Sequence, residues 1–200
     1  MENERLKKQI EFCLEADKEK LVTRQTLVSD SSRGETDAEH AWHLALMCIL
    51  LSEYADEEID LLKTVTMVLI HDIVEIDAGD TYAYDENAKQ TQALREQTAA
   101  DRIFKILPEE QGEKLKALWY EFEECKTAEA KFAHTMDNFQ PVMLNAATDG
   151  KMWLKNKVKL SQILKRNEVT GEGSKQLWEF SCNNFIKPNV EKGRIKDDVN

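Results

Sequence analysis

Residues 65–75 read VTMVLIHDIVE, an apolar run that ends in an adjacent imidazole and carboxylate, His71 and Asp72. Such a run belongs in a protein interior, where a carboxylate without a partner is costly. The pair must therefore be neutralised by hydrogen bonds or hold a cation. If the run continues as a helix, Glu75 lies one turn beyond His71, so all three side chains project toward one region. A metal ion with an activated water molecule fits such a region.

A His-Asp pair alone is also ordinary core chemistry, so other histidines have to distinguish the two interpretations. The sequence TDAE at residues 36–39 predicts a capping box and the start of another helix, apolar almost all round and buried in mid-domain. His40 and His43 share a face of its first turns; one could bind metal, or both could be core residues. Consecutive apolar helices with a short connection pack antiparallel, which would bring His40 near His71 and Asp72.

Two arginines lie in the polar segment 21–35, which we expect to be a loop. The guanidinium groups of Arg24 and Arg33 match the geometry of phosphate oxygens, and loops beside a buried site often supply such contacts. The segment is therefore a candidate phosphate clamp.

A later predicted helix, residues 128–145, carries the remaining candidate ligands. Thr127 can cap it, and its apolar residues mark an inner face. His134 and Asp137 are three residues apart on this helix, and on the residues alone either could be the last ligand.

The composition favours one all-α domain. The chain has 200 residues with only seven Gly and three Pro, and no linker-like segment divides it. Its apolar residues recur at three- and four-residue intervals, which indicates helices. The net charge of -11, with basic and acidic residues interspersed, argues against binding to a nucleic acid polymer or to an anionic membrane. A small phosphorylated substrate remains compatible with that charge.

The four cysteines are scattered and form no Cys-x-x-Cys pair, which indicates neither a zinc ribbon nor a disulfide framework. The first residues, MENERLKK, lack an apolar signal core, and we find no apolar run long enough to span a bilayer. The expected location is the cytoplasm.

The ordered set of His40, the pair His71-Asp72 and Asp137, all on predicted helices, resembles the HD-domain family of metal-dependent phosphohydrolases. The runs DAEH at 37–40 and HDIVEIDAGD at 71–80, with Arg24 upstream, look like the small HD proteins that include bacterial 5'-deoxynucleotidases. This resemblance covers about residues 20–165. It implies a single-domain helical bundle over residues 1–200, with a C-terminal helix and polar tail at 166–200.

The resemblance also implies roles for individual residues. The implied metal ligands are His40, His71, Asp72 and Asp137. Two imidazoles and two carboxylates suit one divalent ion such as Mn, Co, Fe, Ni or Zn. Glu75 would orient or deprotonate the attacking water, with Asp80 as the alternative base. Arg24 and Asp80 would contact the phosphate and the leaving side. Apart from the resemblance, hydrolysis of a phosphate ester calls for cations that offset its charge, and Arg24 together with Arg33 or Lys89 could supply them. Gln25 departs from the pattern, because the deoxynucleotidases tend to carry an aromatic residue there.

The expected reaction is hydrolysis of the phosphomonoester of nucleoside or deoxynucleoside 5'-monophosphates. The alternatives are a phosphodiesterase, a phosphohydrolase of another small metabolite, and a non-catalytic helical module that metal stabilises. We also expect a homodimer, because Trp153, Trp178 and Phe185 exceed what one small core needs.

Overall fold

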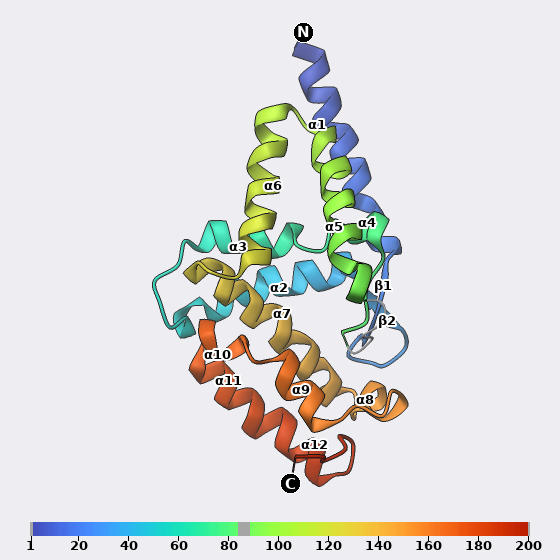
Figure 1. Ribbon diagram of the computed structural model, residues 1–200, viewed down its shortest axis with the longest axis vertical. Coiled ribbons are helices and arrows are strands. Elements are labelled where there is room, and N and C mark those ends of the chain that lie inside the picture. The colour runs from blue at the N-terminus through green and yellow to red at the C-terminus, as the bar shows by residue number, and fades with distance from the viewer. Residues whose placement is uncertain (1, 84–88, 200) are drawn as a thin grey trace.

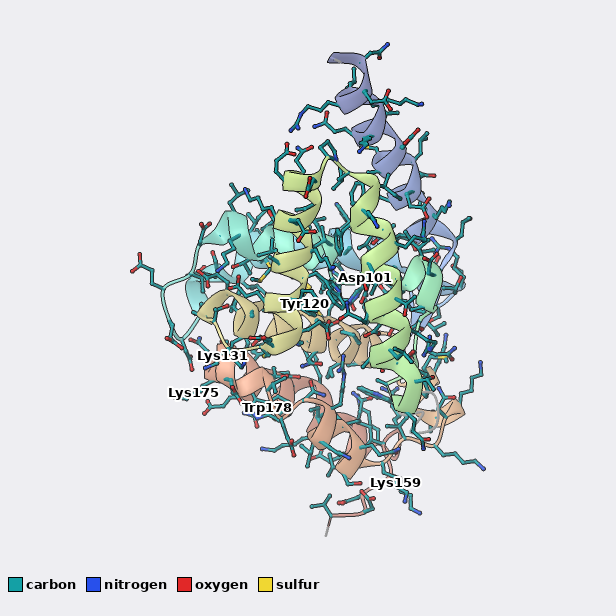
Figure 2. All side chains as sticks on the ribbon, turned by 45° about the horizontal axis from the view of Figure 1, so that its top comes forward. Asp101, Tyr120, Lys131, Lys159, Lys175 and Trp178 are labelled. Atoms are coloured by element: carbon teal, nitrogen blue, oxygen red, sulfur yellow. The ribbon has the colours of Figure 1, made fainter. Side chains whose placement is uncertain are left out.

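The computed structural model describes residues 2–83 and 89–199 of the chain. Helices dominate it, and a two-stranded hairpin is the only sheet among the described residues, so the predicted all-α class is confirmed (Figure 1). Residues 84–86 of an acidic segment that follows Gly79 lie outside the described residues. Charged residues such as Asp101, Lys159 and Lys175 are exposed on the surface (Figure 2). No described helix is long and apolar enough to cross a bilayer.

Most elements of the described chain are helices, and α7 is the longest of them. In order they are α1 Glu2–Ala16, η1 Asp17–Leu21, β1 Thr23–Leu27, β2 Gly34–Thr36, α2 Asp37–Leu51, η2 Ser52–Tyr54, α3 Leu61–Ile70, α4 Glu75–Ala78, α5 Lys89–Ile103, η3 Phe104–Ile106, α6 Glu109–Glu124, α7 Ala128–Ala147, α8 Lys151–Lys155, α9 Leu160–Arg166, α10 Thr170–Gly173, α11 Lys175–Ser181, the π-helical η4 Cys182–Ile186 and α12 Lys187–Glu191.

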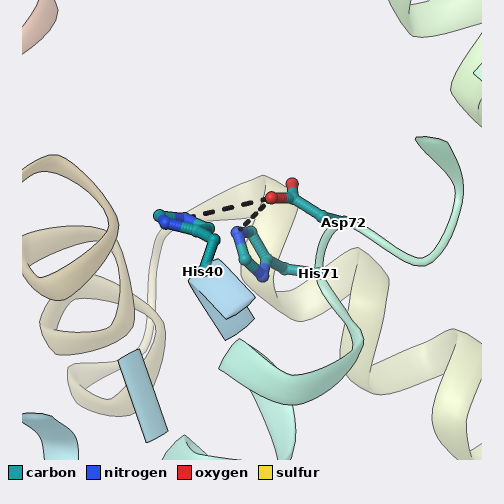
Figure 3. Close-up of side chains that lie close together, drawn as sticks. All are labelled: His40, His71 and Asp72. Atoms are coloured by element: carbon teal, nitrogen blue, oxygen red, sulfur yellow. Dashed lines mark ion pairs between the residues drawn. The ribbon is translucent and has the colours of Figure 1, made fainter. Parts of the chain in front are cut away.

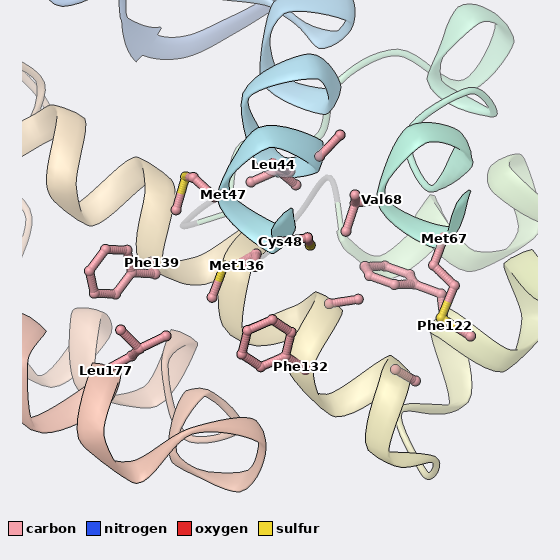
Figure 4. Close-up of a cluster of buried hydrophobic side chains, with 13 residues drawn as sticks. Leu44, Met47, Cys48, Met67, Val68, Phe122, Phe132, Met136, Phe139 and Leu177 are labelled. Carbon is pink, nitrogen blue, oxygen red and sulfur yellow. The ribbon is translucent and has the colours of Figure 1, made fainter. Parts of the chain in front are cut away.

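Helices α2, α3 and α7 form the core that carries the candidate site. The predicted capping box is present at the start of α2, where Thr36 accepts from the amide of Glu39 and the Glu39 side chain returns to Thr36. Apolar side chains from all three helices meet in one buried cluster (Figure 4). The start of α2 lies beside the end of α3, since Nε2 of His40 is 3.9 Å from Oδ2 of Asp72. The two helices therefore pack antiparallel, as predicted.

The helix that was expected to run through Asp72 ends earlier, at Ile70. A tight turn follows, in which the amide of Ile73 bonds to the carbonyl of Ile70 and the amide of Glu75 to that of Asp72. In a continuous helix the carbonyl of His71 would accept from Glu75. Here it accepts instead from the indole Nε1 of Trp119, at 3.0 Å. Glu75 therefore starts a separate short helix, α4.

The segment that was expected to be a loop contains an antiparallel hairpin, β1 with β2. Thr23 pairs with Thr36 and Leu27 with Gly34. The strands approach closely at Gly34, because a Cβ there would lie 2.5 Å from the carbonyl oxygen of Arg24. Only glycine, which has no side chain, fits at that position. The polar composition of the segment did not reveal that its two halves pair as strands.

One face of α2 is exposed, so the prediction that this helix is buried all round is wrong. Its exposed apolar side chains are Trp42, Leu46, Ile49 and Leu50. They lie at i, i+4, i+7 and i+8, which is one stripe of a helix. The opposite stripe supplies the core residues.

The C-terminal aromatic residues pack within the chain. Trp153 is buried in a third apolar cluster, and Trp178 and Phe185 pack against it. Ile195 also belongs to this cluster, so the tail that was expected to be polar contributes a residue to the core. The excess of aromatic residues that suggested a homodimer is therefore explained by this cluster.

Close packing of α10 on α7 provides a test of the fold. A Cβ at Gly173 would lie 2.4 Å from the carbonyl oxygen of Lys131 and 2.4 Å from Oγ1 of Thr135, whereas at Gly171 the nearest atom is 3.4 Å away. We expect Gly173→Ala to destabilise the protein by about 1–3 kcal/mol, because α10 must move away from α7. The melting temperature should fall by about 2–4 °C per kcal/mol.

Gly171→Ala is the matched control on the same short helix and should leave the melting temperature nearly unchanged. Equal melting temperatures for the two variants would contradict the close packing of α10 on α7.

Candidate metal and phosphate site

A cavity of about 220 Å³ lies beside the turn between α3 and α4. Side chains from the hairpin, from this turn, from α5 to α7 and from α8 and α9 line it. His71, Asp72 and Asp137 are at its wall, and Arg24 and Glu75 also face it. The resemblance named all five, and the fold brings them to one place from four different elements.

Four ligand atoms converge beside this cavity, three from residues of its wall and one from His40, which is fully buried behind it. His40, His71 and Asp72 each offer an atom within 4.8 Å of the others (Figure 3). Nε2 of His71 is 3.1 Å from Oδ2 of Asp72 and 3.7 Å from Oδ1 of Asp137. Nε2 of His40 is 3.1 Å from the same Asp137 oxygen. The four predicted ligands are thus neighbours.

The hydrogen bond at the other ring nitrogen of His71 shows which nitrogen carries the proton. Nδ1 of His71 lies 2.9 Å from the carbonyl oxygen of Val68, which can only accept, so Nδ1 donates. In the neutral ring Nε2 then presents a lone pair to Asp72 and Asp137. Burial alone would lower the pKa of His71, but the charges of Asp72 and Asp137 raise it well above its ordinary value, so Nε2 takes up a proton when no metal ion is bound. Among the described residues this buried atom has no hydrogen-bond partner of normal geometry.

Lone pairs and carboxylate oxygens that face one another repel unless a proton or a cation lies among them. Two imidazole nitrogens with two carboxylates form a donor set that suits a divalent transition ion. The residues present therefore fit the metal ion that the resemblance implies. Burial alone would raise the pKa of Asp72 and of Asp137, but the adjacent histidines and arginines outweigh it and lower both pKa values.

A second group of carboxylates surrounds Arg24 on the other side of Asp72. One guanidinium nitrogen of Arg24 lies 2.6 Å from Oδ2 of Asp72 and 3.4 Å from Oδ1 of Asp37. Burial raises the pKa of Glu75 to about 11, and the charges of Asp72 and Asp37 act in the same direction. Asp37, which accepts a hydrogen bond from Glu75, has its pKa raised to about 7, chiefly by burial. Without added positive charge, Glu75 therefore carries a proton at neutral pH.

Of the other residues predicted for the site, some line the cavity and one does not. Asp80 lines the cavity, and burial raises its pKa. Arg33 is not among the described residues that line the cavity; its exposed guanidinium pairs with the carboxylate of Glu39. His134 lines the cavity, stacks on Phe122 with ring centroids 4.0 Å apart, and contacts the carbonyl oxygen of Phe122 through Nε2. That nitrogen is turned away from the four ligand atoms.

Sequence reasoning missed several polar residues of this region. Arg166 of α9 lines the cavity and donates to Oδ2 of Asp137 at 3.1 Å, which leaves Oδ1 facing the histidines. Asp37 belonged to the capping sequence and to the run DAEH, but the sequence assigned it no role in the site. Arg166 lies 29 residues beyond Asp137, and no local pattern marks it.

Comparison with known proteins gives consistent results. Residues 16–178 match the model of an HD domain. A solved structure of a predicted metal-dependent phosphohydrolase from Magnetospirillum magnetotacticum MS-1 is 43% identical, with a TM-score of 0.91 over 96% of each chain. The 5'-deoxynucleotidase HDDC2 of Dictyostelium discoideum is 34% identical over 64% of this chain and 71% of its own length. The human protein of that name is 30% identical over 56% of this chain and 53% of its own length, so the match spans about half of it.

The two candidates for the last ligand can be separated by mutation. We expect Asp137→Ala to lose bound metal, because its Oδ1 lies among the other ligand atoms. His134→Ala should keep most of it, because the Nε2 atom of His134 faces a backbone carbonyl. Metal content of both purified proteins, measured by elemental analysis, checks this. The reverse result would reassign the ligand to His134.

Proposed function

Because the chain belongs to the HD-domain family, we propose that it hydrolyses the phosphomonoester of nucleoside and deoxynucleoside 5'-monophosphates with the help of one divalent metal ion. The observation that carries this proposal is the convergence of four ligand atoms beside a buried guanidinium. The proposed ligands are His40, His71, Asp72 and Asp137. The names of the relatives supply the substrate class.

A divalent ion at these ligands, whether Mn, Co, Fe, Ni or Zn, would favour ionisation of water and offset phosphate charge. Glu75 accepts the proton of the attacking water in this proposal. Its pKa falls when positive charge is added nearby, so the carboxyl that is neutral without a cation becomes a base. Arg24 contacts the phosphate, and Asp80 lies toward the leaving oxygen.

Two features of the cavity bear on the substrate. Arg166 lines it and supplies a second guanidinium in place of Arg33, whose partner is Glu39 on the surface. Gln25 also lines the cavity, at the position where the resembling deoxynucleotidases tend to carry an aromatic residue. An amide forms hydrogen bonds that an aromatic ring cannot, so we propose that both ribose and deoxyribose monophosphates are accepted.

The test is a substrate panel on protein stripped of metal and then loaded with each of the five ions. Ribo- and deoxyribonucleoside monophosphates, a sugar phosphate and a cyclic dinucleotide cover the alternatives. Phosphate release from the monophosphates is expected; hydrolysis of only the cyclic dinucleotide would indicate a phosphodiesterase. Chelation should also lower the melting temperature, by the equivalent of about 2.7 kcal/mol where metal is at about 100 times its dissociation constant. Metal-loaded protein without activity would support a non-catalytic module.

The role of Glu75 predicts a specific kinetic change. Glu75→Gln should leave folding and metal content nearly intact, because the amide has the same shape and the native carboxyl is already neutral without metal. Turnover should fall by about 100- to 10,000-fold, with a smaller change in KM. The measurement is kcat at saturating metal.

The alternative role for Glu75 is a hydrogen bond that only orients a ligand. In that case Gln would weaken metal binding by about ten- to a hundred-fold, and saturating metal would restore turnover. Restored turnover would remove Glu75 from the catalytic residues and shift the base role to Asp80.

A homodimer also remains a proposal, now supported by the exposed stripe of α2. Exposed apolar side chains at Trp42 and Ile49 are typical of a surface that another protein covers. Ile49→Glu should therefore reduce the mass in solution from dimer to monomer at micromolar concentration. Leu94→Glu, on the exposed face of α5, is the control and should not. A monomeric wild-type protein would refute the dimer.

The cytoplasm is the proposed location. The structure describes all four cysteines, and each is a free thiol, as is common in reducing compartments.

A further inference from the structure

His40 uses its second ring nitrogen to contact a glutamine in the protein interior. Nδ1 of His40 lies 3.2 Å from Oε1 of Gln140, a fully buried residue of α7. The Nε2 atom of Gln140 donates to Oε2 of Glu35 at 2.8 Å. We infer that Glu35 and Gln140 are positioning residues, which hold the His40 ring in the one tautomer and orientation that leave Nε2 free to bind a metal ion.

The direction of each hydrogen bond follows from what each group can donate. A carboxylate only accepts, so the side of Gln140 that faces Glu35 must be its amino group. The amide oxygen of Gln140 then faces His40, and Nδ1 must carry the proton. Nε2 is then the ring nitrogen that faces Oδ1 of Asp137, at 3.1 Å. Because that carboxylate only accepts, Nε2 donates to it in the absence of metal, and a metal ion at this place would replace that proton. The buried carboxylate thereby sets the tautomer of a candidate ligand through one amide.

The two histidines reach the same tautomer by different means. His71 donates to the carbonyl of Val68, which is three residues earlier in its own segment. His40 depends on side chains from two other elements, Glu35 on β2 and Gln140 on α7. Its orientation is therefore sensitive to single substitutions, whereas that of His71 is fixed by the backbone.

The charge of Glu35 also has a partner. Its Oε1 lies 3.6 Å from Nε of Arg24 and 3.5 Å from Nδ1 of His40. Glu35 is only 3% exposed, so a carboxylate there requires such compensation. The hairpin therefore links the proposed phosphate-binding arginine to a proposed metal ligand through one buried carboxylate.

This inference rests on the proposed function only in taking His40 as a metal ligand. The tautomer is measured in protein loaded with diamagnetic Zn²⁺, which replaces the Nε2 proton, by the ¹⁵N shifts of the imidazole nitrogens, with His40→Gln used to assign the signals. Metal affinity is then measured with Co²⁺ alone, in competition with a chromophoric chelator. Wild-type protein that bound no Co²⁺ would refute the proposed metal site, whereas Co²⁺ binding that is insensitive to Gln140 would refute only this inference.

Gln140→Met keeps the side-chain length and removes the hydrogen bonds of Gln140 to His40, to Glu35 and to His43. We expect the His40 signals to change from a single Nδ1–H tautomer to a mixture, and the Kd for Co²⁺ to rise by about ten- to a hundred-fold. The matched control is Thr135→Val, which removes a buried hydroxyl of the same helix that bonds to Lys131 and Thr170. The control should lose stability without a change in tautomer or in Kd.

Glu35 supplies a second pair of variants should Gln140→Met fail to fold. Glu35→Gln retains an acceptor for Gln140 and should stay within about threefold of the wild-type Kd, since a neutral acceptor preserves the orientation. Glu35→Met removes the acceptor and should weaken Co²⁺ binding by about tenfold or more. Wild-type affinity and a single tautomer in Gln140→Met, or in Glu35→Met, would overturn the inference. So would an equal loss of affinity in Thr135→Val.

Discussion

The convergence of four ionisable ligand groups in the interior is the constraint on which the rest of this structure depends. Two imidazoles and two carboxylates are held within a few ångströms of one another in a largely buried place. Such groups are stable there only with protons or a cation among them, so packing elsewhere must keep all four in place. The apolar cluster of α2, α3 and α7 does this, because each of these helices carries or immediately precedes part of this set and none can move without opening that cluster (Figure 4).

A second requirement is the change of chain direction after His71. A continuous helix would carry Glu75 onward on the same axis as α3. The indole of Trp119 takes the carbonyl of His71, so the helical ladder is interrupted and α4 starts with Glu75 beside Asp37. The tight turn thus places Glu75, the candidate base, next to the proposed ligands. The carbonyl of His71 keeps a hydrogen bond, which comes from Trp119 of α6.

Acidic side chains outnumber basic ones around the site. Besides the two candidate carboxylate ligands, Glu35, Asp37 and Glu75 lie close to Arg24. Burial raises the pKa of Glu19 to about 8, and the charge of Asp72 acts in the same direction. A site of this kind attracts cations and stores protons until a cation arrives. Metal binding and proton release are therefore expected to be linked.

The sequence by itself determined the helical class, the capping box of α2 and the antiparallel pair that brings His40 to His71, because these depend on local periodicity and on short connections. It also singled out Asp137 by resemblance. Only the tertiary structure decided that α3 ends at Ile70, since the group that interrupts the helix is an indole 48 residues away. The contacts of His40 with Gln140 and of Asp137 with Arg166 were likewise decided by the tertiary structure. The two residues of these pairs lie 100 and 29 positions apart in the sequence. The exposed stripe on α2 is equally non-local: an apolar pattern shows which residues can be buried, whereas the neighbouring helices determine which of them are.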